Sequence, residues 1–180
     1  MDRLVAIIKV EDIFPEYRGT PIGRLIEYHN LEREYEQYDK AELLIGMCID
    51  NRENLHLPDN FAFIIRTAGA NLQNSEFNVS FTIAFGQLSH IALIGHNECG
   101  MAHLSSHKDI FIDRLAKLAG WDREKAEEHF HECAPQFEIG NEVDFIMRET
   151  NRLRLKYPKV HVAPLLYSVD DGKLYLINED

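Results

Sequence analysis

Short apolar segments that alternate with helical segments constrain the fold of this chain most strongly. The runs AELLIGMCI (41–49), NFAFIIRT (60–67) and HIALIGH (90–96) are apolar throughout most of their length and compatible with β-strands. Strands of a parallel sheet have this character because helices cover both faces of the sheet. Two further strands are expected at 160–169 and 173–178, joined by the turn DDG.

Helical segments lie between and around these strands. The stretch 19–38 is predicted to be a helix, with Thr20 as N-cap and Pro21 at the first helical position. The segment 75–88 is a second predicted helix, with Ser75 as a cap. Further helices are expected from periodicity, charge and terminal Gly or Pro at 105–120, 122–134 and 140–158.

This alternation predicts an α/β protein with a mainly parallel central sheet flanked by helices. The length of 180 residues suits one domain with a substantial core. We therefore expect a single domain over residues 1–180, with an N-terminal arm and helix (1–40) and an α/β core that holds the site (41–180). Phe77, Phe81 and Phe85 recur at helical spacing and are predicted to form a core stripe.

Composition limits the partners of the chain. The net charge is −11 and no block of Lys or Arg stands out, which argues against nucleic acid as a partner. No apolar run reaches the roughly 18 residues that a membrane span requires. The N-terminal stretch MDRLVAIIKVEDIF lacks a small-residue cleavage site, so we expect a structured arm. Three cysteines without a disulfide-type spacing favour the cytoplasm.

Two of the apolar runs end in residues that bind metals. Cys48, Asp50 and Arg52 occupy alternate positions where the first run ends, so they share one side of an extended segment. His96 ends the third run, and Cys99 follows one helical turn later. Ligands of open α/β sheets bind beyond the carboxyl ends of the strands, which places both stretches at one site.

The predicted donors suit zinc. Two thiolates and one imidazole, from Cys48, Cys99 and His96, are the ligands that Zn²⁺ prefers, and three protein ligands leave one tetrahedral position open for catalysis. Asp50 is near enough in sequence to compete for that position. Arg52 is expected to hold Asp50 away through a bidentate ion pair, which keeps the position open and lets Asp50 accept the hydrogen bond of a bound water.

The two motifs together resemble the β-class carbonic anhydrases, whose signature is C-x-D-x-R followed some tens of residues later by H-x-x-C. The similarity is closest from Glu42 to Met101, where GHNECGM resembles the Gly-His-x-x-Cys-Gly-Met of the family almost letter for letter. IIRTAGAN resembles the family's Arg-Asn-Ala-Gly-Asn loop, with Thr67 where the family usually has Asn and one extra residue before Asn71. LLYSVDDGKL more loosely resembles its late strand and turn.

The resemblance implies a function for each of these residues. Cys48, His96 and Cys99 take the roles of metal ligands for one Zn²⁺ per chain, and Asp50 and Arg52 take the role of the catalytic gating pair. The implied enzyme is a carbonic anhydrase, a zinc lyase that reversibly hydrates CO₂ to bicarbonate by attack of zinc-bound hydroxide. The implied assembly is a homodimer or a larger homo-oligomer, with the site near the subunit interface and the N-terminal helix against the partner.

Two alternatives stay open. Carbon disulfide and carbonyl sulfide hydrolases resemble the same family and keep the same ligands and pair, so the substrate does not follow from the motifs. A non-catalytic zinc- or bicarbonate-binding protein would need the fourth position closed, by Cys133 or permanently by Asp50. The resting state of the site, a proton shuttle and an allosteric bicarbonate site are likewise undetermined.

Other histidines and acids have simpler explanations. His129, His131 and Cys133 in EHFHEC do not share one face of a helix, so we expect no second metal site and a half-buried thiol at Cys133. His103 is expected to be a solvated or capping residue. Glu98, between two of the predicted ligands, is expected to face solvent.

Overall fold

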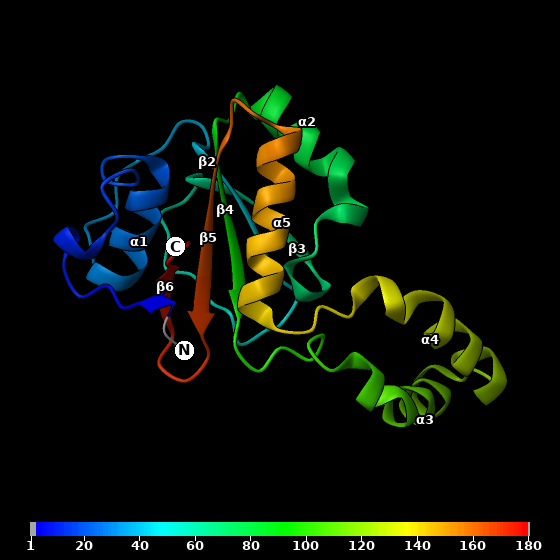
Figure 1. The fold of residues 1–180 in the computed structure, drawn as a ribbon. Coiled ribbons are helices and arrows are strands. Elements are labelled where there is room, and N and C mark those ends of the chain that lie inside the picture. The colour runs from blue at the N-terminus through cyan, green and yellow to red at the C-terminus, as the bar shows by residue number, and fades with distance from the viewer. Residues whose placement is uncertain (1–2, 180) are drawn as a thin grey trace.

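The core of the protein is a six-stranded sheet in the order β1-β6-β5-β4-β2-β3, in a computed structural model that describes residues 3–179 (Figure 1). Strands β5, β4, β2 and β3 are parallel, while β6 and β1 are added antiparallel at one edge. The predicted α/β architecture with a mainly parallel sheet is confirmed. The strands are Leu4–Val5 (β1), Leu43–Cys48 (β2), Ala62–Thr67 (β3), His90–His96 (β4), His161–Ser168 (β5) and Lys173–Ile177 (β6).

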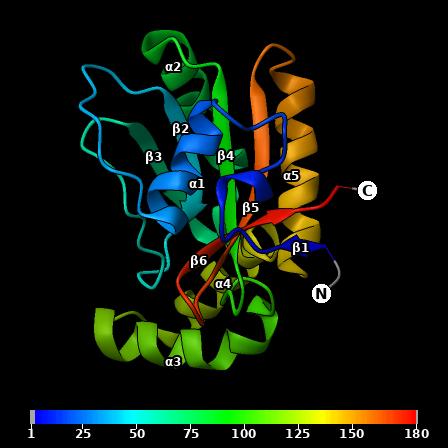
Figure 2. The same cartoon turned by 90° about the vertical axis from the view of Figure 1, so that its left-hand side faces the viewer.

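Helices cover both faces of the sheet (Figures 1 and 2). Helix α1 (Pro21–Leu31) lies on one face, and α2 (Glu76–Gly86) and α5 (Glu142–Lys156) lie on the other. Among the helices of residues 3–179, none has the length and apolar character that a bilayer crossing requires.

Alternation along β2 divides its side chains between two separate cores. Leu43, Ile45 and Met47 belong to the apolar cluster that includes α1, whereas Leu44 and Cys48 belong to the cluster that includes α2 and α5. Successive side chains of a strand point to opposite faces, so both faces of β2 are buried, as the continuous apolar run predicts. Cys48 therefore ends the strand on the α5 side.

Strand β3 differs from the expectation of a buried central strand. It is the edge strand beside β2, and Phe63 and Ile64 are 43% and 48% exposed in the single chain. Its apolar run has the composition of a covered strand, but composition does not reveal which strand lies at the edge of a sheet. The exposed edge leaves an apolar surface on the outside of the single chain.

The first helix is shorter than the sequence predicts. Thr20 caps it as expected, since its side-chain oxygen accepts a hydrogen bond from the Gly23 N–H at 3.3 Å. The helix ends at Leu31 rather than near residue 38, because Glu32 adopts the left-handed conformation with φ 54°. The chain then turns back, and the Tyr28 and Tyr38 hydroxyls lie 2.7 Å apart. Tertiary packing of aromatic rings has overridden helix propensity here.

The predicted core stripe of Phe77, Phe81 and Phe85 is wrong for the single chain. These side chains are 78%, 47% and 76% exposed, while Val79 and Thr82 form the buried side of α2. Helical spacing correctly places the three rings on one face, and two neighbouring pairs of rings are in contact. Spacing alone does not say whether the chain itself or a partner covers that face. Ser75 also makes no side-chain capping bond.

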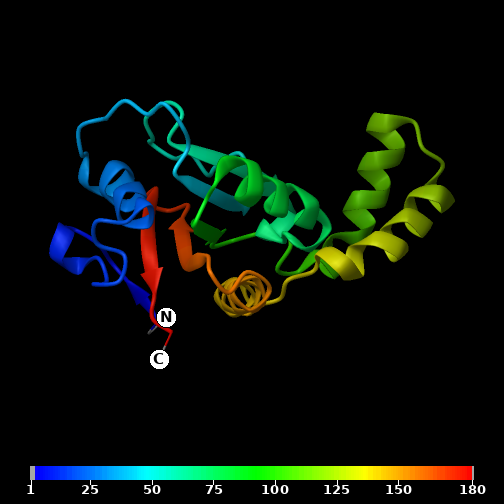
Figure 3. The ribbon, with the colours of Figure 1, turned by 90° about the horizontal axis from the view of Figure 1, so that it is seen from above.

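Helices α3 (Lys108–Ala119) and α4 (Arg123–Phe137) form a hairpin that extends away from the sheet (Figures 1 and 3). Gly120, with φ +70°, ends α3 in the left-handed conformation that glycine adopts without strain. The base of the hairpin is closed by a hydrogen bond from the Ile139 N–H to the Met101 carbonyl at 3.0 Å. The chain therefore leaves the core for the hairpin and rejoins the core at nearly the same point.

Buried His29 joins three parts of the fold and is held as the neutral imidazole. Its Nδ1 accepts from the His56 N–H at 3.1 Å, and its Nε2 lies 2.9 Å from the Gly172 carbonyl, which requires a proton on Nε2. Burial lowers the pKa of His29 from 6.5 to about 4, although the Gly172 carbonyl favours the proton. The folded state thus takes up this proton less readily than the unfolded chain does.

Acidification is therefore expected to destabilise the protein through His29. The stabilising contribution is present above pH 6.5 and is lost as the pH falls toward the folded pKa of about 4. Between pH 7 and pH 5 the linked loss is about 2 kcal/mol. Urea unfolding of the wild type and of His29→Gln at both pH values measures it. We expect the free energy of unfolding of His29→Gln to depend less on pH by that amount. The same pH dependence in both proteins would contradict the role given to His29.

Candidate metal centre

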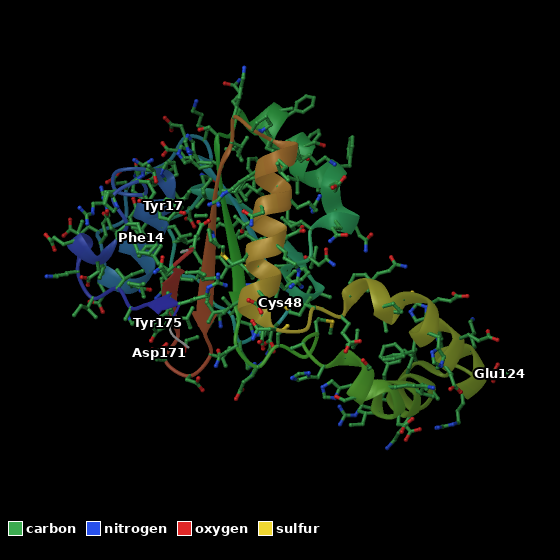
Figure 4. All side chains as sticks on the ribbon, in the orientation of Figure 1. Phe14, Tyr17, Cys48, Glu124, Asp171 and Tyr175 are labelled. Carbon is green, nitrogen blue, oxygen red and sulfur yellow. The ribbon has the colours of Figure 1, made fainter. Side chains whose placement is uncertain are left out.

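The predicted ligands come from the carboxyl ends of two neighbouring parallel strands. Cys48 is the last residue of β2 and His96 is the last residue of β4, and Cys99 follows in the turn after β4. Figure 4 shows Cys48 at the end of the sheet where the α3–α4 hairpin departs. Glu98 makes this turn possible by adopting the left-handed conformation, with φ 56°.

The three side chains meet in one buried cluster. One donor atom each from Cys48, His96 and Cys99 lies within 4.8 Å of the other two, a separation at which one metal ion can be held. The two Sγ atoms are 4.0 Å apart, and both cysteines are free thiols. Cys48, His96 and Cys99 are 3%, 1% and 6% exposed, so bulk water has little access to these side chains.

The imidazole of His96 is oriented for a ligand. Its Nδ1 lies 2.9 Å from the Asn97 carbonyl, which fixes the ring and places the proton on Nδ1. Its Nε2 is buried and has no hydrogen-bond partner within residues 3–179. A buried nitrogen without a partner is costly, and coordination to a metal ion would satisfy it. The donor set of two sulfurs and one imidazole nitrogen fits Zn²⁺.

One thiol of the pair is strongly acidified. The pKa of Cys48 is lowered, because the Cys99 thiol donates a hydrogen bond to it; burial opposes this shift, and the Gly69 N–H supports it. The same contact and burial raise the pKa of Cys99. These contacts favour the thiolate of Cys48, the form that binds a metal ion.

The loop RTAGAN lies directly against the centre. The Gly69 N–H donates to Cys48 Sγ at 3.3 Å, with Gly69 in the left-handed conformation at φ +64°. A side chain at this position would also clash with Ile139, since a Cβ would come within 2.8 Å of its Cγ2. The Thr67 hydroxyl is buried beside this loop without a partner among the described residues. A glycine at 69 is therefore required by both conformation and space.

Asp50 and Arg52 form a bidentate ion pair beside the cluster. Arg52 Nη2 lies 2.9 Å from Asp50 Oδ2, and Arg52 Nε lies 3.1 Å from Asp50 Oδ1. These hydrogen bonds hold the pKa of Asp50 at about 2, against a smaller effect of burial. Asp50 Oδ2 lies 3.9 Å from His96 Nε2, so the carboxylate is adjacent to the predicted ligand atom.

Three further residues contact the Asp50–Arg52 pair or the segment that carries it, and none of these contacts was predictable from the sequence. Arg52 donates to the Glu98 carbonyl at 3.0 Å and pairs with its carboxylate at 3.2 Å, so Glu98 is solvent-exposed as expected but not unpartnered. Arg66 donates to the carbonyls of Cys48 and Asp50 at 2.8 and 3.2 Å. Glu53 is completely buried, and burial raises its pKa to about 8. No local sequence signal distinguishes this glutamate from a surface one.

The other cysteine lies outside the centre. Cys133 is on α4 with its Sγ 3.7 Å from His129 Nδ1 and is partly buried, as expected for a half-buried thiol. Within residues 3–179, Cys48, His96 and Cys99 form the only group of three or more potential metal ligands that lie close enough to one another. His129, His131 and Cys133 of EHFHEC are not part of that group.

The fold is shared with solved enzymes, although no protein-family model and no curated protein matches the sequence. β-Carbonic anhydrase isoform I of Trichomonas vaginalis superposes with a TM-score of 0.61 at 22% identity, over 83% of this chain and 91% of that protein. Carbonic anhydrase of Streptococcus mutans gives 0.56 at 19% identity, over 96% and 100% of the two chains. A carbon disulfide hydrolase in its apo form gives 0.55 at 18% identity, over 77% and 79%.

These superpositions agree with the motifs that resemble the β-class enzymes in the sequence. The parallel strands β2 and β4, which end at Cys48 and His96, lie at the centre of a sheet with helices on both faces. A group able to hold a metal ion sits at their carboxyl ends. The chain therefore has the fold of the β-carbonic anhydrases.

Proposed function

We propose that this protein is a β-class carbonic anhydrase that uses one Zn²⁺ per chain to hydrate CO₂ reversibly to bicarbonate. The observation that carries the proposal is the buried Cys48, His96 and Cys99 group with the Asp50–Arg52 pair beside it. Similarity of fold alone would not suffice, because one fold hosts several reactions. The combination of these donors and this pair at one end of the sheet supports the specific reaction.

Each residue has a defined task in this proposal. Cys48, Cys99 and His96 Nε2 would hold the ion, and three protein ligands would leave room for a water molecule. When bound, Zn²⁺ lowers the pKa of a water molecule to about 7 and so supplies a nucleophile for CO₂ at neutral pH. Arg52 holds Asp50 away from the ion through two parallel hydrogen bonds. Asp50, ionised throughout the physiological range, would accept a hydrogen bond from a water molecule at the centre and so orient it.

Hydrolysis of carbon disulfide or carbonyl sulfide is the second candidate. A carbon disulfide hydrolase superposes on this chain about as well as the Streptococcus mutans carbonic anhydrase does, with TM-scores of 0.55 and 0.56. The proposed ligands and pair would serve either substrate. A purely metal- or bicarbonate-binding role is less well supported, because Cys133 does not join the ligand group and Arg52 restrains Asp50.

Stopped-flow hydration of CO₂ by the zinc-loaded protein tests the proposal. Assays from about pH 6.5 to 9 bracket the ionisation that a zinc site imposes on water, and activity is expected to rise through a single step. Parallel assays with CS₂ and COS distinguish the second candidate. Turnover of CS₂ without turnover of CO₂ would replace the first proposal, and turnover of neither with zinc fully bound would contradict both.

We further propose that the protein is a homodimer or larger homo-oligomer in the cytoplasm and that residues 1–180 form one domain. Phe77, Phe81 and Phe85 on α2, and Phe63 and Ile64 on the edge strand β3, expose large apolar side chains in the single chain. Large contiguous apolar patches on a soluble protein mark association surfaces. A second copy of the chain would cover them, and free thiols at all three cysteines support a reducing compartment.

The double variant Phe77→Glu/Phe85→Glu is expected to dissociate this assembly. Burial of these two phenylalanines would stabilise the assembly by about 3 kcal/mol or more, so replacing both is expected to weaken association by about 100-fold or more. Sedimentation equilibrium of the wild type and the variant measures the change. Leu155→Glu is the matched control, because Leu155 is 85% exposed on α5. Dissociation of the control alone would place the interface elsewhere.

A further inference from the structure

Glu53 is a buried carboxyl at the metal centre to which the reaction assigns no task. It follows Arg52 directly, and its side chain is 0% exposed. Its Oε2 accepts the backbone N–H of Cys48 at 3.0 Å. Its own carbonyl accepts from Arg66 Nη2 at 2.7 Å, and its N–H donates to the Asp50 carbonyl at 3.3 Å. The residue is thus tied to the segment 48–53 through both its backbone and its side chain.

The Cys48 N–H needs this acceptor because the sheet divides at this point. The pairing of β2 with β3 continues to Cys48, and the Ile49 N–H still donates to the Thr67 carbonyl at 3.2 Å. The pairing of β2 with β4 ends at Gly46 and Leu93. Successive N–H groups of a strand point to opposite sides, so the Cys48 N–H points toward β4, where no strand partner remains.

Glu53 therefore replaces a missing strand partner next to a metal ligand. Where β2 and β4 have stopped pairing, Cys48 from one strand and His96 from the other approach the same point. An unpaired buried N–H at Cys48 would be destabilising and would free the backbone that carries the ligand sulfur. Glu53 Oε1 is buried without a partner among the described residues, which is a cost that packing alone does not explain.

We infer that Glu53 is a positioning residue that fixes the backbone of Cys48 and so sets the geometry of the metal ligands. The inference rests on the proposed metal centre, but not on the identity of the substrate. Partners of metal ligands typically contribute about 10- to 100-fold to metal affinity through orientation. Glu53→Met keeps the approximate volume of the side chain but removes the acceptor, whereas Glu53→Gln keeps an acceptor oxygen without the carboxyl group.

Titration of the metal-free protein with Co²⁺ tests this inference, with the thiolate-to-metal absorption band as readout. We expect Glu53→Met to bind Co²⁺ about 10- to 100-fold more weakly, with a shifted band, and Glu53→Gln to restore the wild-type affinity and band. The matched control is Glu149→Met. Glu149 is also buried and accepts a backbone N–H, from Leu72 at 3.3 Å, and it is not one of the three clustered ligands. This control should lower the melting temperature without changing Co²⁺ binding.

The outcomes separate this inference from the proposed function. Wild-type affinity and band in Glu53→Met would overturn the positioning role and leave the metal centre intact. Equal weakening in Glu53→Gln and Glu53→Met would also overturn it, since the acceptor would not be the cause. A wild-type protein that binds no Co²⁺ would overturn the metal centre and this inference together. If Glu53→Met does not fold, Glu53→Asp applies the same test, because its carboxylate is one methylene too short to reach the Cys48 N–H.

Discussion

Replacing Arg52 with alanine is expected to lower CO₂ hydration by about 100-fold or more while zinc stays bound, because the paired charge-assisted hydrogen bonds that restrain Asp50 are lost. The variant frees the Asp50 carboxylate, whose Oδ2 already lies 3.9 Å from His96 Nε2. The released carboxylate is expected to bind the ion at the position that water needs. Stopped-flow assays together with zinc analysis of the same samples measure both quantities.

Two further variants test whether the ion pair itself is the cause. Arg52→Lys keeps the charge but not the paired N–H groups, so it should recover activity only in part. Arg123→Ala removes an arginine that pairs with Asp113 on the projecting hairpin, and it should leave hydration unchanged. Full activity in Arg52→Ala would mean that Asp50 needs no restraint. Loss of zinc in the same variant would mean that Arg52 supports the metal centre rather than the open position.

Replacing Cys48 with alanine is expected to abolish stoichiometric zinc binding, and with it all hydration. Hydrogen bonds from the Cys99 thiol and the Gly69 N–H favour the thiolate of Cys48, the form that binds a metal ion. Removing a sulfur that binds the metal directly lowers the metal affinity more than removing a residue that only orients a ligand. The loss of zinc affinity should therefore exceed about 100-fold. Competition with a chelator and zinc analysis after desalting give the affinity and the stoichiometry.

Cys133→Ala is the matched control for that variant. It removes a free, half-buried cysteine that does not belong to the ligand group, so one zinc per chain should remain. Circular dichroism of both variants establishes that each is folded. Zinc retained at full stoichiometry by Cys48→Ala would contradict the assigned ligand set, and zinc lost from Cys133→Ala would indicate a third thiolate and a closed site.

The central part of the sheet was predictable because burial on both faces leaves an apolar run in strands β2 and β4. The runs at 41–49 and 90–96 become β2 and β4, and their last residues supply Cys48 and His96. Convergence of the site follows from general geometry, since parallel strands place their carboxyl ends at one edge. The Asp50–Arg52 pair was also predictable from the sequence, because alternate positions of an extended segment lie on the same side.

Features that depend on distant contacts were not predictable. The end of α1 depends on packing between Tyr28 and Tyr38, which no local window contains. The burial of Glu53 depends on where the pairing of β2 with β4 stops, a property of two strands far apart in sequence. The exposed phenylalanines of α2 show the limit of periodicity, which identifies the face of a helix but not what covers that face.

The closed base of the α3–α4 hairpin has a consequence for how this chain tolerates changes in length. The excursion begins after Met101 and returns at Ile139, and one backbone hydrogen bond of 3.0 Å joins these two residues. All three proposed ligands precede it, and the sheet resumes beyond it. Changes of length at the far end of the hairpin, around Gly120, are therefore expected to leave the three proposed ligands in place, whereas changes near Gln136 are not, because its carbonyl accepts from Asn71 Nδ2 at 2.9 Å. The junction is different, because Met101 and Ile139 pack against Gly69, whose N–H contacts Cys48.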